Sequence, residues 1–169
     1  MLKIIGIAPI STGELVVDPY VPLSFRSYDT VPYLWRIGDF HRSLLEISIE
    51  QSTGILYDVT LTLPGSSMLA NLPTGYELVP EKIGLPIIEI SAITWEGEYI
   101  GIWDEKHEFS LLLKNDAVYI VFDSSLNPSS CISVDRVTFF EAESVLCGIG
   151  FFSLAPEEIA LLKKYFIKV

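Results

Sequence analysis

Strict alternation of apolar and polar residues is the feature that most constrains the fold of this chain. In LEISIEQSTGILYDVTLTL, residues 45–63, two alternating runs flank a polar turn at residues 51–54. Successive side chains of a strand point to opposite faces, so the pattern predicts a β-hairpin with one buried and one solvated face. The predicted inward residues are Leu45, Ile47, Ile49, Ile55, Tyr57, Val59, Leu61 and Leu63. The predicted solvated residues are Glu46, Ser48, Glu50, Asp58, Thr60 and Thr62.

The same alternation predicts three more hairpins further along the chain. One covers residues 109–122 and turns at Lys114-Asn115-Asp116, and another covers residues 131–152 and turns at residues 141–144. A third would pair residues 98–103 with residues 107–113 across an Asp104-Glu105-Lys106 turn. Most strands are therefore expected to pair with their neighbours in sequence.

One helix is predicted near the C-terminus, over residues 156–167. Pro156 suits the first helical position, acidic residues follow it, and lysines lie near the other end, as the helix dipole favours. Ile159, Leu162 and Phe166 form its apolar stripe. The predicted fold class is α+β and mainly β, an antiparallel sheet of successive hairpins with a C-terminal helix packed on it, in a single domain over residues 1–169. The proline- and glycine-rich segment 64–86 is expected to be a long loop or a connector between two sheet layers.

Mean hydropathy is high, at +0.42, yet no membrane span is predicted. The longest run without charge, residues 59–76, is interrupted by prolines and glycines, and the N-terminus lacks the pattern of a signal peptide. These features predict a cytoplasmic protein. The two cysteines are expected to be unpaired, because the predicted hairpin places Cys147 opposite about Val137, several residues from Cys131.

The net charge of −11 is concentrated in the middle of the chain. Residues 43–154 carry sixteen acidic residues against four basic ones. Such a field repels nucleic acids and anionic membranes and attracts cationic partners. The expected partner is therefore a basic protein, and neither a nucleic acid nor a membrane.

The strongest concentration of charge and aromatic residues is ITWEGEYIGIWDEKHEF, residues 93–109. One hypothesis is an acidic face that binds a basic partner, with a tryptophan as its aromatic anchor. Its residues would be Glu96, Glu98, Trp103, Asp104, Glu105 and Glu108. An alternative is an enzyme that acts on a sugar or another neutral small molecule, with Glu96, Glu98 and Trp103 in its site. The predicted pairing separates Glu98 from Glu108 by roughly 13 Å, too far for the carboxylate pair of a glycosidase.

Other motifs carry weaker signals, and no catalytic residue, metal site or cofactor is predicted. Ser67 with His41 or His107 would resemble a serine hydrolase, but the second glycine of a nucleophile elbow is absent. The histidines and cysteines lack the spacing of a zinc site. Asp39, His41 and Arg42 form a cluster that is expected to lie in a loop or on an edge strand, without a chemical role.

Residues 40–123, in LLEISIEQSTGILYDVTLTL and EYIGIWDEKHEFSLLLKNDAVYIVFD, resemble small acidic, mainly β immunity proteins encoded beside bacterial polymorphic and contact-dependent toxins. The resemblance rests on alternation, acidity and size, and it assigns no functional residue. It implies a stoichiometric inhibitor that covers the active site of a cationic toxin, such as a nuclease, without chemistry of its own. This is the leading hypothesis, and an intracellular adaptor or scaffold domain is a further alternative.

Overall fold

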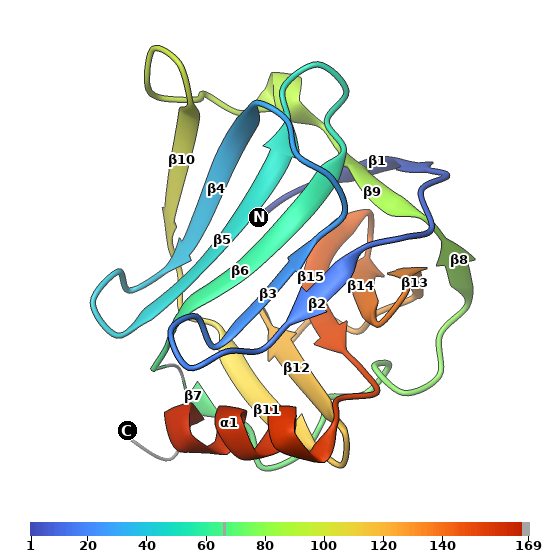
Figure 1. Cartoon of the computed structure of the whole chain (residues 1–169). Helices are drawn as coiled ribbons and strands as arrows, with labels where there is room; N and C mark the ends of the chain where they lie inside the picture. Colours follow the sequence, from blue (N-terminus) through green and yellow to red (C-terminus); the bar gives the residue numbers. More distant parts are fainter. Residues whose placement is uncertain (66, 167–169) are drawn as a thin grey trace.

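Two β-sheets packed face to face form the body of the molecule in a computed structural model, which describes residues 1–65 and 67–166 (Figure 1). One sheet has six strands in the order β10-β4-β5-β6-β3-β2. Its strands are β2 (Glu14–Val16), β3 (Leu23–Arg26), β4 (Pro32–Gly38), β5 (Ser43–Glu50), β6 (Leu56–Pro64) and β10 (Gly101–Lys106). All neighbours in it are antiparallel except β10 and β4, which are parallel.

The other sheet has seven strands in the order β7-β11-β12-β15-β14-β13-β8. Its strands are β7 (Ser67–Met68), β8 (Glu81–Ile83), β11 (Ser110–Lys114), β12 (Ala117–Val121), β13 (Ser130–Val134), β14 (Val137–Ala142) and β15 (Val145–Phe151). The inner faces of the two sheets meet in one core. Within it, Phe25 contacts Phe139 and Trp35 contacts Phe122, with ring centroids 6.5 and 5.6 Å apart. The predicted mainly β fold is confirmed.

The two ends of this sandwich are closed differently. At one end, β1 (Ile4–Ala8) pairs with β9 (Leu85–Ile88), and a short 3₁₀ helix, η1 (Ile90–Ala92), follows. At the other end lies helix α1 (Pro156–Phe166), the lowest element in Figure 1.

Helix α1 agrees with the predicted helix up to Phe166, and the predicted last residue, Ile167, lies outside the described residues. Leu162 and Phe166 are buried in the core as expected, whereas Ile159 is only partly buried. Glu158 strengthens the helix start, since its carboxylate accepts a hydrogen bond from the Ala155 amide at 2.7 Å. Burial alone would raise the pKa of Glu158, but the hydrogen bonds from Arg136 and Ala155 lower it overall.

The first predicted hairpin is confirmed as β5 and β6, with three corrections. A bulge between Leu44 and Leu45 places Leu63 opposite Leu44, so Leu63 is only partly buried although it was expected to point inward. A bulge near Ser48 brings Leu56 opposite Ile49, so Leu56 is fully buried and Ile55 only partly buried. Asp58 was expected to be solvated but is 4 % exposed, because Arg26 covers its carboxylate at 2.5 Å. The predicted hairpin at residues 109–122 is confirmed as β11 and β12.

The predicted hairpin at residues 131–152 is wrong in its register. The chain makes three strands there, because an additional tight turn forms at Asp135 and Arg136, where Asp135 has a φ of +49°. The β14–β15 turn is tight and lies at Glu143 and Ser144, both with positive φ, so Val137 lies opposite Phe151 and not opposite Cys147. Cys131 pairs with Phe140 on β14, while Cys147 lies on β15, so β14 separates the two cysteines, which are free and buried.

The predicted pairing of residues 98–103 with residues 107–113 is also wrong. β10 pairs with β4, more than sixty residues earlier, and β11 belongs to the other sheet. Lys106 is the last residue of β10, and the chain then crosses to the seven-stranded sheet. Trp103 therefore lies against Trp35 of β4 and not against the residues that begin β11.

The segment 64–86 joins the two sheets and then crosses one of them. β7 and β8 pair with opposite edges of the seven-stranded sheet, and residues 69–80, here named the strap, run between them. The Leu69 amide donates to the Leu111 carbonyl, and the Cys131 amide donates to the Pro80 carbonyl. Beneath the strap a second apolar cluster forms on the outer face of the sheet, and it contains Tyr76, Leu112, Ala117, Tyr119, Val121, Cys131, Phe140, Ala142 and Cys147.

Among the described residues, no helix has the length and apolar character needed to cross a membrane.

Candidate functional site

A loop of five residues, 96–100, projects from the edge of the six-stranded sheet just before β10 (Figure 1). Its base is closed by two hydrogen bonds between the main chains of Glu96 and Ile102, at 2.8 and 2.7 Å. Gly97 allows the tight reversal, because its φ is +114° and a Cβ there would lie 2.5 Å from the Ile100 carbonyl oxygen. The loop is therefore a defined turn.

Aromatic side chains fix the base of this loop on the sheet. Tyr33 stacks on Trp95 with ring centroids 4.4 Å apart and planes 4° from parallel, and the Trp95 indole donates to the Ile90 carbonyl. Gly101 lies against both residues, and a Cβ at this position would lie 2.6 Å from the Tyr33 ring and 2.7 Å from the Trp95 Cβ. A side chain at residue 101 would therefore disturb the stack.

The β5–β6 turn also holds the tip of the loop. The Gln51 side-chain amide donates to the Pro32 carbonyl at 2.9 Å and to the Tyr99 carbonyl at 3.3 Å. One side chain thus joins the start of β4 to the loop.

Apolar and acidic side chains are exposed together on this end of the sheet. Tyr99 is 86 % exposed, Val31 58 % and Ile100 47 %. The Glu96 and Glu98 carboxylates are exposed and form no ion pair with any described residue. We call Val31, Glu96, Glu98, Tyr99 and Ile100 the end surface. It combines exposed apolar groups with two negative charges that have no internal partner.

Two of the six predicted partner-binding residues, Glu96 and Glu98, lie in the end surface. Asp104 and Glu105 are instead neutralised within the molecule. Arg36 donates two hydrogen bonds to Asp104, at 2.6 and 2.7 Å. Glu105 accepts hydrogen bonds from the Met1 amino group at 2.8 Å and from the Trp35 indole at 2.9 Å.

Trp103 and Glu108 also lie apart from the exposed tip. Trp103 is partly buried and stacks on Trp35, with ring centroids 6.1 Å apart, so it supports the sheet more than it offers an anchor. Glu108 is exposed beyond the far end of β10, and a six-residue strand separates it from the loop by about 20 Å. The predicted acidic face is thus divided between two ends of one strand.

A hollow of about 450 Å³ lies beside the loop, and both Glu96 and Trp103 line it. Lys3 and Glu89 are also in its wall and form an ion pair at 2.8 Å. Glu98 does not line this hollow. Among the described residues, Glu96 is therefore the one carboxylate of this hollow that is not already paired with a lysine. The enzyme hypothesis requires Glu96 and Glu98 in one site, and this arrangement does not support it.

Tyr99 and Ile100 were not predicted as site residues. The predicted hairpin placed Tyr99 on a strand face opposite Leu111, which would have buried its ring. The glycines of EGEYIG are the signal that was available, since Gly97 and Gly101 bracket residues 98–100 and favour a turn that exposes them.

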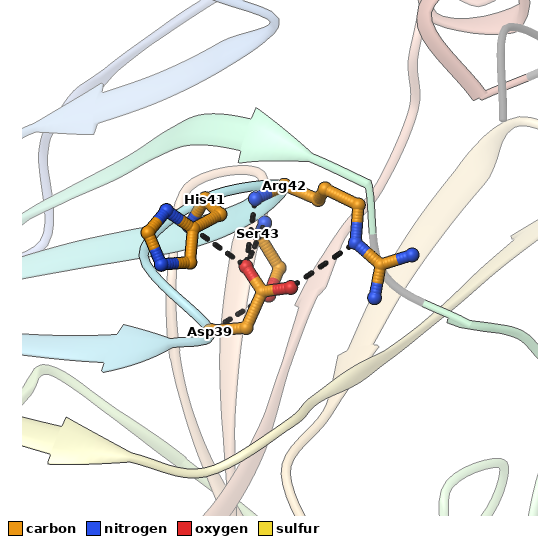
Figure 2. Close-up of polar contacts among 4 residues, drawn as sticks. All are labelled: Asp39, His41, Arg42 and Ser43. Carbon is orange, nitrogen blue, oxygen red and sulfur yellow. Dashed lines mark hydrogen bonds and ion pairs between the residues drawn. The ribbon is translucent and has the colours of Figure 1, made fainter.

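The cluster around Asp39 closes the β4–β5 turn, as Figure 2 shows. One Asp39 carboxylate oxygen accepts hydrogen bonds from the amides of Ser43, Arg42 and His41 at 2.7 to 2.9 Å. These three donors hold the pKa of Asp39 well below its usual range. The His41 ring lies on the opposite side of the turn from the Arg42 guanidinium. The predicted loop is confirmed, and Asp39 shapes it.

His107 follows Lys106, which pairs with Gly38 next to this turn, but its ring contacts another part of the chain. The His107 Nε2 lies 2.9 Å from the Phe122 carbonyl oxygen, and the cysteines are buried on the outer side of the seven-stranded sheet. No group of three or more His, Cys, Asp or Glu side chains within residues 1–65 and 67–166 is placed to hold a metal ion.

No protein-family model matches the chain, and no curated protein sequence matches it.

Proposed function

We propose that this protein binds a basic protein partner through the end surface at the tip of the six-stranded sheet. The observation that carries the proposal is the exposure of Tyr99 on the same short loop as two carboxylates, Glu96 and Glu98, that form no ion pair with a described residue. Tyrosine is among the residues that contribute most to protein interfaces, because its large ring loses little conformational freedom on binding. The anchored base of the loop lowers the entropy cost further.

The acidity of the chain supports a cationic partner. With a net charge of −11, the molecule accelerates its encounter with a positively charged protein, and the nearby carboxylates orient that protein on arrival. The resemblance to immunity proteins extends the proposal to a particular class of partner. The protein acts in the bacterial cytoplasm, where it neutralises a cationic toxin domain, such as a nuclease, by stoichiometric binding.

The test uses the product of the adjacent gene as the partner and measures its affinity by calorimetry. Tyr99→Ala is expected to cost about 2 kcal/mol, close to a thirtyfold loss, if Tyr99 is the central anchor. The matched control is Tyr20→Ala, since Tyr20 is 91 % exposed in the β2–β3 connection beside helix α1. The control is expected to leave the affinity unchanged.

A second pair of variants tests the role of charge. The double variant Glu96→Gln/Glu98→Gln is expected to slow association mainly at low salt, because exposed charges are screened at higher ionic strength. Its control is Glu108→Gln/Asp135→Asn, which removes two exposed acids elsewhere. Equal losses in both double variants would show that only net charge matters, and an unchanged affinity of Tyr99→Ala would contradict the proposed surface.

A further inference from the structure

A second hollow, of about 410 Å³, lies on the outer face of the seven-stranded sheet, between the strap and the β11–β12 turn. Tyr119 and Thr138, on the strands either side of β15, lie opposite Gly150, which has no side chain to fill the space. The Phe152 ring occupies part of it, 2.6 Å from where a Cβ of residue 150 would be. The β11–β12 turn lies at the helix end of the molecule, far from the end surface (Figure 1).

The floor of this hollow is aromatic. Tyr76, Tyr119, Phe140 and Phe152 line it. Tyr119 meets Phe152 edge to face with centroids 5.4 Å apart, and Tyr76 meets Phe140 at 4.6 Å. Aromatic rings attract positive charge through their electron-rich faces, so such a floor suits an organic cation.

Tyr119 supplies a polar group that lacks a partner. The residue is 7 % exposed, and its hydroxyl makes no hydrogen bond with any described residue. Buried tyrosine hydroxyls normally have a partner, because an unsatisfied one is costly. Burial raises the pKa of Tyr119, and the charges of Lys114, Glu77 and Asp116 also act on it. Tyr119 lines the hollow together with these three charged residues, so a bound molecule can reach its side chain.

The rim carries more negative than positive charge. The described charged residues that line it are three acids, Glu77, Glu81 and Asp116, and one base, Lys114. Lys114 already forms an ion pair with Glu77. Glu81 and Asp116 form no ion pair with a described residue. The hollow is thus left with two carboxylates to neutralise.

We propose that this hollow is a binding site for an organic cation, a guanidinium or alkylammonium group on a short aliphatic chain. The cationic head would donate to Asp116 or Glu81 and to the Tyr119 hydroxyl, while the chain lies on the aromatic floor. A pocket of this volume accommodates a small molecule of that kind. The site is independent of the end surface and of the function proposed for it.

The test titrates the full chain with agmatine and follows the amide resonances of residues 114–117 by NMR. Tyr119→Phe, which keeps the ring and removes the hydroxyl, is expected to weaken binding about fivefold, the loss of one hydrogen bond. The double variant Glu81→Gln/Asp116→Asn is expected to weaken it about tenfold at low salt. Tyr20→Phe is the matched control and leaves the affinity unchanged.

The Lys114→Met variant tests whether the hollow prefers a positively charged ligand. The variant removes the one positive charge on the rim and releases Glu77, so agmatine is expected to bind several-fold more tightly. N-butylurea, a neutral compound of similar shape, is expected not to bind. Tighter binding of agmatine by Lys114→Met supports the proposal, whereas weaker binding by that variant overturns it.

Two further results would also overturn the proposal: equal binding of N-butylurea, or no shift of these resonances at 10 mM agmatine, roughly the upper limit of a useful millimolar affinity. An acetylated Gly-Arg-Gly amide distinguishes the sources of the cation. If the peptide binds as well as agmatine, the site takes an arginine side chain of a protein. If agmatine binds and the peptide does not, the site takes a free small molecule.

Discussion

The outer faces of the two sheets differ in how far they are covered by the rest of the chain. The outer face of the six-stranded sheet is largely polar, and no element within residues 1–65 and 67–166 covers it (Figure 1). The strap covers the outer face of the seven-stranded sheet and buries a second apolar cluster there. Burial along the strands follows this division. β5 alternates between buried and partly buried residues, while every residue of β12 is buried.

This difference is visible in the sequences of the strands. A strand with one solvated face alternates, and a strand covered on both faces reads as a continuous apolar run. In AVYIV of β12 and VLCGIGF of β15, the apolar residues on the outer face require a cover. The strap, rich in proline and glycine, supplies it without forming a third sheet.

The largest effect that separates the two faces is expected at Tyr76. Its ring is 3 % exposed between the strap and the sheet, and its hydroxyl donates to the Cys147 carbonyl at 3.0 Å. Tyr76→Ala is expected to lower the free energy of unfolding by about 3 to 5 kcal/mol, as large-to-small changes of buried aromatic residues do. Urea denaturation measures it. A loss below about 1 kcal/mol would mean that the strap adds little to the fold.

The reactivity of the buried Cys147 thiol measures how well the strap covers the seven-stranded sheet. Burial raises the pKa of Cys147 to about 11, so at pH 8 the folded protein is expected to react slowly with a disulfide reagent. Tyr76→Ala is expected to accelerate the reaction at least about tenfold by opening the strap. Both cysteines are expected to titrate as free thiols after denaturation without reductant. Fast reaction of the unsubstituted, folded protein would contradict a closed strap.

A smaller effect is expected from the proton on Tyr76. Burial, with the adjacent Cys147, raises the pKa of Tyr76 far above its usual 10. The folded state then holds this proton more tightly than the unfolded chain, so the free energy of unfolding falls as the pH rises above about 10. Tyr76→Phe is expected to cost about 1 kcal/mol at pH 8 and to reduce this dependence. Denaturation curves at pH 8 and pH 11 give the free energy of unfolding of both proteins. An equal loss of stability between these pH values in both proteins would contradict the raised pKa of Tyr76.

The smallest effect is expected on the open face. Ser24 lies on β3 between Thr60 and Val16 and is partly exposed. Ser24→Ala is expected to change the free energy of unfolding by less than about 0.5 kcal/mol, as surface substitutions usually do. The same urea experiment applies. A loss as large as that of Tyr76→Ala would remove the contrast between the faces.

Local pattern was sufficient for the elements whose partners are close in sequence. The β5–β6 and β11–β12 hairpins and helix α1 were predicted because alternation, turn residues and helix-end signals all act over a few residues. The parallel pairing of β10 with β4 was not, since nothing in residues 101–106 specifies a partner more than sixty residues away. The tight turn at Asp135 and Arg136 was missed because it lacks the glycine that usually marks such turns.

The candidate site shows the same limit. The acidity of residues 96–108 was evident from sequence, and Glu96 and Glu98 do lie on an exposed loop. Which acids are neutralised depends on long-range contacts, as Arg36 with Asp104 and Met1 with Glu105 illustrate. Charge counting could not separate these acids from the exposed ones, nor could it place Trp103 against Trp35.

Hydrogen exchange of the complex with the adjacent gene's product tests the proposed binding surface most directly. The account predicts slower amide exchange in residues 96–102 and in the neighbouring start of β4, because the partner covers the end surface. Exchange in the strap, residues 69–80, is predicted to stay unchanged, because this segment already covers the other sheet at the far side of the molecule. Protection confined to the strap, with none in residues 96–102, would contradict the account.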